Sequence, residues 1–115
     1  MKYTGGCHCG AVRFEADLVI EKLMSCNCSI CSKRGYLLAF APEKNFKLLS
    51  GETSLTDYQF GKKNIHHLFC KICGISSFGN GTMPDGAAVR AINARCLDNI
   101  DLAQVPVFEF DGKSL

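Results

Sequence analysis

The cysteines are the residues of this chain whose type and spacing could do chemistry. Seven of the eight fall into three tight clusters: Cys7 and Cys9; Cys26, Cys28 and Cys31; Cys70 and Cys73; Cys96 stands apart. Thiolates a few residues apart can converge on one soft divalent metal ion, about 2.3 Å from each sulfur in the case of zinc. The clusters therefore predict one complete zinc site, made by the two pairs, and one site with an open position, made by the triad.

The first and last clusters predict a structural site. Cys70 and Cys73 lie in a C-x-x-C-G sequence, the form of a zinc knuckle, whose glycine lets the chain turn so that amides face the sulfurs. Cys7 and Cys9 complete a set of four thiolates that would tie the N-terminus to the middle of the chain. An alternative interpretation of Cys70 and Cys73 is a thioredoxin-type redox pair, which would need a helix in a βαβ context.

The triad of Cys26, Cys28 and Cys31 has no fourth ligand beside it. Three protein ligands with an open position are typical of catalytic zinc, which can accept a substrate thiol and lower its pKa to generate a nucleophile at neutral pH. Other interpretations stay open. The triad could hold no metal, or disulfides could form, although cysteines one residue apart are awkward partners. The site could also be closed by a fourth ligand, the candidates being Cys96, His8, His66 and His67.

Residues around the clusters add further expectations. Lys33 and Arg34 directly follow the triad and could hold the carboxylates of an anionic thiol, although a solvated surface pair is an equally good interpretation. His66 and His67 lie on an expected strand, so their side chains should point to opposite faces, one to the core and one to the surface. Cys96 is most simply a buried apolar residue.

Length and composition place limits on the fold and on the partners. The 115 residues are 47% hydrophobic and 21% charged, which predicts one zinc-binding domain over residues 1–115. A net charge of +2 gives no case for binding nucleic acid or a membrane. Neither a secretory signal nor a transmembrane span is predicted, so we expect a cytoplasmic protein. Clustered cysteines in that reducing compartment are more often metal-binding or catalytic than disulfide-bonded.

The elements that must position the clusters are predicted to be short strands. In residues 10–16, Val12, Phe14 and Ala16 share one face, and Arg13 and Glu15 take the other. The nearly continuous apolar run at 36–41 predicts a strand buried on both faces. Further strands are expected at 46–49, 55–60, 64–69, 75–78, 87–94 and 105–110, with turns at 50–52, 79–81 and 84–86.

Helix signals are weak, with one turn expected around residues 29–33 and another near 97–102. Many short strands at this spacing indicate an all-β domain of short antiparallel strands. Cys7 and Cys9 should lie just before the first strand, and Cys70 and Cys73 just after a strand near mid-chain.

Three stretches in register resemble the glutathione-dependent formaldehyde-activating enzyme family, which also includes centromere protein V. They are residues 6–14 (GCHCGAVRF), 26–31 (CNCSIC) and 69–74 (FCKICG). Residues 93–98 (NARCLD) and 110–113 (FDGK) look like the C-terminal pattern of the family, so the resemblance runs nearly end to end. The chain is short compared with the named glutathione enzyme, whose extra segments help to form the thiol pocket.

The resemblance implies a small β-tent fold similar to methionine-R-sulfoxide reductases and to a Rab exchange factor. It implies a structural zinc on Cys7, Cys9, Cys70 and Cys73, and a catalytic zinc on Cys26, Cys28 and Cys31. The activity it implies is a carbon–sulfur lyase class reaction that joins glutathione to formaldehyde and gives S-hydroxymethylglutathione.

Two functions from different classes fit these observations. The first is an enzyme in which the triad zinc holds a thiolate beside a small aldehyde such as formaldehyde, with proximity as the main contribution of the protein. The second is a non-catalytic zinc module for a protein or nucleic-acid partner. The chain has no tryptophan, no basic tail and no interleaved aromatic and basic residues of the kind that single-strand binders use, so nucleic acid is disfavoured.

Overall fold

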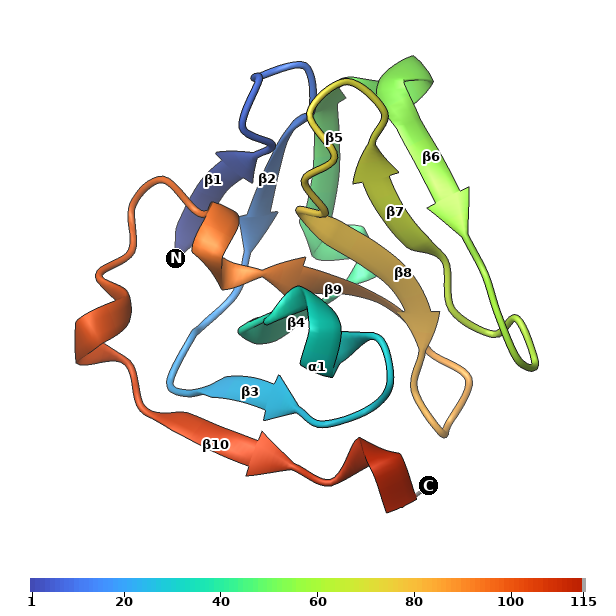
Figure 1. Ribbon diagram of the computed structural model, residues 1–115. Helices are drawn as coiled ribbons and strands as arrows, with labels where there is room; N and C mark the ends of the chain where they lie inside the picture. The colour runs from blue at the N-terminus through green and yellow to red at the C-terminus, as the bar shows by residue number, and fades with distance from the viewer. Residues whose placement is uncertain (115) are drawn as a thin grey trace.

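The computed structural model describes residues 1–114, and short strands dominate it (Figure 1). The strands are β1 (Lys2–Gly6), β2 (Arg13–Asp17), β3 (Leu23–Cys26), β4 (Leu38–Pro42), β5 (Phe46–Ser50), β6 (Leu55–Tyr58), β7 (His67–Cys70), β8 (Phe78–Thr82), β9 (Ala88–Asn93) and β10 (Val107–Phe110). One short helix, α1 (Cys31–Arg34), follows β3. Short 3-10 turns are η1 (Glu43–Asn45), η2 (Glu52–Ser54), η3 (Ala94–Cys96), η4 (Leu102–Gln104) and η5 (Gly112–Ser114). The predicted all-β class is confirmed.

The strands form three sheets. A three-stranded sheet has the order β1-β2-β5, a five-stranded sheet the order β10-β3-β4-β9-β8, and β6 pairs with β7. Figure 1 shows the three-stranded sheet and the β6-β7 pair above the five-stranded sheet, with α1 packed near β3. An isolated bridge between His66 and Asn80 connects the approach to β7 with β8. The strand pairs are antiparallel, as expected, except that β10 runs parallel to β3, with Phe110 opposite Cys26.

The core lies between the sheets and is centred on aromatic rings. Phe14 is fully buried, and its ring centroid lies 5.1 Å from that of Phe46 and 5.8 Å from that of Phe78. On β2 the predicted alternation is confirmed, with Phe14 and Ala16 buried and Arg13 and Glu15 partly exposed. Such aromatic packing adds about 0.5–1.5 kcal/mol per pair beyond area burial.

Several strand predictions need correction. β1 and β3 were not expected, so Cys7 and Cys9 follow the first strand and lie in its connection to β2. On β4, Ala39 and Ala41 are buried but Phe40 is 40% exposed, so the strand is not covered on both faces. The residues expected to form a strand at 75–78 join a strand only at Phe78.

The glycines at 79–81, expected to make a turn, lie inside β8. Gly79 pairs with Ala91 of β9, and Asn80 bridges His66 on the other side. A Cβ atom at Gly79 would come within 2.9 Å of the His66 carbonyl oxygen, so glycine here permits close approach of two backbones.

The helical turn expected near 97–102 is displaced to two 3-10 turns that flank this range, η3 before it and η4 from Leu102 onward. Leu97 instead bridges Gly5, and the Asp98 amide donates to the Thr4 carbonyl at 2.8 Å. The Asp98 carboxylate pairs with Arg13 and accepts a hydrogen bond from the Thr4 hydroxyl at 2.9 Å. These tertiary contacts hold the segment in a non-helical conformation with a bend at Asp98 and Asn99. Across residues 1–114, no helix has the length and apolar character needed to span a membrane.

Candidate functional site

The structure brings Cys7, Cys9, Cys70 and Cys73 together at one end of the molecule. Their sulfurs all lie within 4.8 Å of one another, with Cys9 Sγ 3.6 Å from Cys7 Sγ and 3.7 Å from Cys70 Sγ. The β1-β2 loop and the loop after β7, neighbours at the top of Figure 1, carry the two pairs. Four sulfurs at these separations are a donor set that fits zinc.

Backbone amides support negative charge on this four-cysteine cluster. Cys73 has a pKa of about 6, lowered by hydrogen bonds from the amides of Ile75 and Cys9. Burial opposes ionisation of Cys7, but the Val12 amide, 3.3 Å from its sulfur, and the thiols of Cys9 and Cys70 lower its pKa overall. Gly74 has a φ of +80°, the left-handed conformation that the knuckle turn requires.

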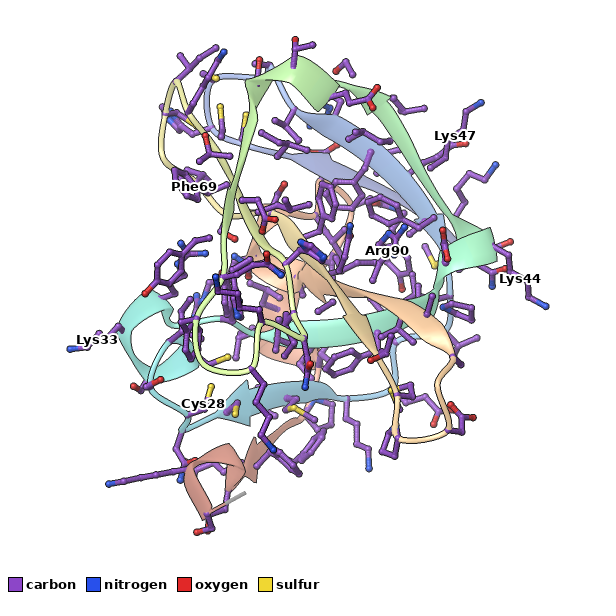
Figure 2. All side chains as sticks on the ribbon, turned by 90° about the vertical axis from the view of Figure 1, so that its right-hand side faces the viewer. Cys28, Lys33, Lys44, Lys47, Phe69 and Arg90 are labelled. Atoms are coloured by element: carbon purple, nitrogen blue, oxygen red, sulfur yellow. The ribbon has the colours of Figure 1, made fainter. Side chains whose placement is uncertain are left out.

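The second cluster, the triad, lies between β3 and α1. Cys26 ends β3, Cys31 begins α1, and their sulfurs and that of Cys28 lie within 4.8 Å of one another. The Cys28 amide donates to Cys26 Sγ at 3.5 Å. All three side chains are partly exposed. Figure 2 shows Cys28 near β3, well away from the sulfurs at the top of the view.

The pKa values of Cys28 and Cys31 are pushed in opposite directions. Burial works against the Cys28 thiolate, but the Cys31 amide and the other two thiols stabilise it, so its pKa is lowered. Burial raises the pKa of Cys31, and hydrogen bonding and charge repulsion from Cys28 raise it further. Of these two thiols, Cys28 therefore ionises more readily than Cys31.

No other ligand joins the triad among the described residues. No histidine nitrogen, carboxylate oxygen or fourth sulfur lies within 4.8 Å of all three sulfurs. His8 is exposed in the four-cysteine loop, and Cys96 lies in η3 with its sulfur 4.0 Å from the Ser76 carbonyl oxygen. Burial raises the pKa of Cys96 to about 11, which keeps it a neutral thiol. The structure thus leaves one side of the triad without a protein ligand.

The C-terminal segment is fastened across the triad through Asn27. Its side-chain amide donates to Asp111 Oδ1 at 2.9 Å, and its Oδ1 accepts from the Lys113 amide at 2.9 Å. Gly112 lies between these contacts. A Cβ atom built on it would come within 2.5 Å of Cys26 Sγ and 3.4 Å of Cys28 Cβ, so this position accepts only glycine without a shift.

We expect Gly112→Ala to weaken metal binding at the triad while leaving the four-cysteine cluster intact. Either Cys26 Sγ or the C-terminal segment must move, and metal sites tolerate only about 0.5 Å of displacement. The expected result is a loss of at least about tenfold in the affinity of the triad for zinc, measured by competition with a chelator. Gly81→Ala is the matched control, since its Cβ would meet only Ile65 Cγ1 at 3.9 Å. Equal metal affinity in both variants would contradict the close-approach argument.

The triad opens into a cavity of about 570 Å³. Its polar and charged lining residues, besides the triad, are Ser29, Tyr36, His67, Asn93 and Lys113. Its apolar lining residues are Met24, Ile30, Leu38, Phe40, Phe60, Ile65, Phe78, Ala91 and Phe110. The walls come from β3, β4, β7, β8, β9 and the C-terminal segment, together with the loop before β7, so residues from Met24 to Lys113 meet here.

His67 was expected to face the core or the surface, and the structure places it in the cavity wall. Its ring stacks on Phe60 with centroids 5.2 Å apart. Burial and the positive charge of Arg34 lower its pKa, so the imidazole is neutral at pH 7. His66 instead is exposed and lies 2.6 Å from Asp57 Oδ2. No sequence signal distinguished the two histidines, because the cavity depends on the packing of distant strands.

The two cations predicted beside the site do not line the cavity. Lys33 is exposed on α1 and points away from the molecule in Figure 2. The Arg34 guanidinium donates to the Tyr36 hydroxyl at 2.6 Å and lies over the Phe69 ring, 5.6 Å from its centroid. Lys113 does line the cavity. Its place beside the triad depends on the Asn27 contacts, which sequence alone does not reveal.

Comparison with known proteins agrees with this arrangement. A family model described as glutathione-dependent formaldehyde-activating enzyme matches residues 2–110. The crystal structure of a Rhodobacter sphaeroides protein, solved by structural genomics, is 31% identical in sequence with a TM-score of 0.78. That match covers 91% of this chain and 99% of the other. The range matched by the family model spans both cysteine clusters and every residue of the cavity lining except Gly112 and Lys113.

Proposed function

Because the chain belongs to the glutathione-dependent formaldehyde-activating enzyme family, we propose that it joins glutathione to a small aldehyde such as formaldehyde at the triad. The product would be S-hydroxymethylglutathione, in a reaction of the carbon–sulfur lyase class. The observation that carries this proposal is that Cys26, Cys28 and Cys31 line a cavity and lack a fourth protein ligand, whereas the four-cysteine cluster does not line it.

Both clusters have donor sets that fit zinc, and their coordination implies different roles. Cys7, Cys9, Cys70 and Cys73 would hold a structural ion, since four thiolates leave no position for a substrate. Cys26, Cys28 and Cys31 would hold the catalytic ion. When bound there, zinc lowers the pKa of a thiol that enters the open position and so supplies a thiolate at neutral pH.

The residues of the cavity would position the thiol and the aldehyde and keep water away from them. The reaction needs one new bond from the thiol sulfur to the aldehyde carbon, while the proton released from the thiol ends on the former carbonyl oxygen. His67 offers a neutral imidazole in the wall that can carry this proton. Tyr36 also lines this space, and its hydroxyl is held in place because it accepts from Arg34 and donates to Ser76 Oγ at 2.7 Å.

The decisive experiment is metal analysis followed by titration with glutathione. We expect two zinc ions per chain and a change in the coordination spectrum of one cobalt-substituted site when glutathione is added. Addition of formaldehyde should then release product. Glutathione binding without turnover by any aldehyde would favour the non-catalytic module instead.

Recognition of glutathione carboxylates gives a second test. Lys33 and Arg34 remain proposed contacts, and Lys113 joins them because it lines the cavity. A charge-assisted hydrogen bond contributes about 1.5–3 kcal/mol, so loss of the relevant cation should weaken glutathione binding by about tenfold or more. We expect this for Lys113→Ala or for Lys33→Ala with Arg34→Ala, without any change in binding of 2-mercaptoethanol.

The matched control is Lys44→Ala, since Lys44 is exposed and lies far from Cys28 in Figure 2. Isothermal titration of both thiols against each variant separates the outcomes. Equal losses for the charged and the neutral thiol would mean that the substitution had damaged the triad rather than removed a carboxylate contact.

A further inference from the structure

The cavity beside the triad is much larger than the aldehyde of the proposed reaction requires. Its volume of about 570 Å³ falls within the range of about 300–1,000 Å³ that is typical of sites for drug-sized ligands. Formaldehyde has only two non-hydrogen atoms and would occupy a small part of this space. The remaining volume is available to another group, and the lining decides its chemistry.

Most of the lining is apolar. Met24, Leu38 and Phe40 contribute from β3 and β4, Phe78 from β8, and Phe60 and Ile65 from the connection between β6 and β7. Three of these side chains stay open to solvent although they are large and apolar: Phe40 is 40%, Phe60 40% and Ile65 46% exposed. Apolar surface gathered around one cavity is typical of a ligand site rather than of scattered surface residues.

The lining has too few charged groups to pair with those of a buried glutathione tripeptide. Among the residues that the structure describes, Lys113 is the one permanently charged group in the wall, and no carboxylate lines it. Glutathione carries two carboxylates and an ammonium, and burial of such groups without partners is strongly unfavourable. The peptide part of glutathione therefore belongs at the mouth, near Lys113, and the apolar space is left for the other reactant.

We propose that the cavity takes an apolar aldehyde, with its alkyl chain or aromatic ring against Phe40, Phe60 and Ile65 and its carbonyl carbon beside the triad. This inference rests on the proposed function and names a substrate class larger than formaldehyde. The chemistry balances without a further reactant. The thiol sulfur bonds to the carbonyl carbon, the π electrons move to oxygen, and the thiol proton converts that oxygen to the hydroxyl of a hemithioacetal.

The first test measures binding without any reaction. The primary alcohols methanol, propan-1-ol and hexan-1-ol stand in for the aldehydes and are titrated into the zinc-loaded protein by NMR. Each added methylene should tighten binding by about fourfold until the cavity is filled, the gain expected for burying one CH₂ group. Affinity that is flat or falls with chain length overturns the proposal.

The second test distinguishes an apolar aldehyde from an apolar thiol. The value of kcat/KM is measured for hexanal with glutathione, for formaldehyde with glutathione, and for formaldehyde with hexane-1-thiol. The proposal expects the largest value for hexanal with glutathione. If kcat/KM exceeds the value for formaldehyde with glutathione only when hexane-1-thiol is the thiol, the proposal is overturned in favour of an apolar thiol. Chain-length-dependent alcohol binding without turnover of any pair would overturn the proposed function while the apolar site stands.

A matched pair of variants locates the binding surface. Ile65 lines the cavity and is 46% exposed, whereas Leu49 on β5 is 48% exposed and lies outside the lining. Ile65→Ser should weaken hexan-1-ol binding by about 16-fold and leave methanol binding unchanged, because it removes about two buried methylene equivalents at about fourfold each. Leu49→Ser should change neither. Equal effects of the two variants on hexan-1-ol binding would contradict the assignment of Ile65 to the binding surface. Thermal melting of each variant checks that it is folded.

Discussion

Cys70→Ser is expected to unfold the protein. Cys70 ends β7, and its side chain is fully buried. Its sulfur lies 3.7 Å from the sulfur of Cys9, which is in the loop between β1 and β2. Serine is a poor zinc ligand, so the substitution removes one of four contacts that tie β1 and β2 to β7. Structural zinc contributes about 10–16 kcal/mol in small metallodomains, whereas whole domains are stable by only about 5–15 kcal/mol.

The measurement is the circular dichroism spectrum and zinc content of the purified variant. The matched control is Cys96→Ser, a partly buried free cysteine outside both clusters, which should keep the fold and the zinc. A Cys70→Ser protein that is folded, stable and unaltered in zinc content would show that the four-cysteine cluster is not the structural site.

Cys28→Ser is expected to give a folded protein without thiol-dependent activity. The triad lies at the edge of the fold, between the end of β3 and the short helix α1, and its side chains are partly exposed. Loss of a ligand there should remove little core packing. Activity should fall more than about 100-fold. Substitution of residues that only orient a metal ligand lowers metal affinity or activity by about 10–100-fold, and Cys28 would be a ligand itself.

Thermal melting, zinc stoichiometry and turnover with glutathione and formaldehyde check this result together. We expect one tightly bound zinc to remain and the melting temperature to change by only a few degrees, as for a substitution of about 1 kcal/mol. If Cys28→Ser were as unfolded as Cys70→Ser, the division into one structural and one catalytic cluster would be wrong.

The sequence by itself determined which cysteines belong together and which face of β2 is buried. Grouping was predictable because ligands close in the chain are held close in space, as Cys26, Cys28 and Cys31 show. The buried face was predictable because side chains alternate along a strand, as Phe14 and Glu15 do. It was also predictable that Cys7 and Cys70 lie close together, since the two cysteine pairs supply the four thiolates of one zinc site.

Tertiary structure alone decided what surrounds the triad. The choice between His66 and His67, the approach of Gly112 to Cys26 and the apolar walls all depend on strands distant in sequence. Gly79 and Gly81 resemble turn residues locally, yet β9 and the His66 backbone hold them in a strand. Local patterns report the preferences of neighbouring residues, whereas a cavity is the space left when non-local elements pack, so no short stretch of sequence encodes it.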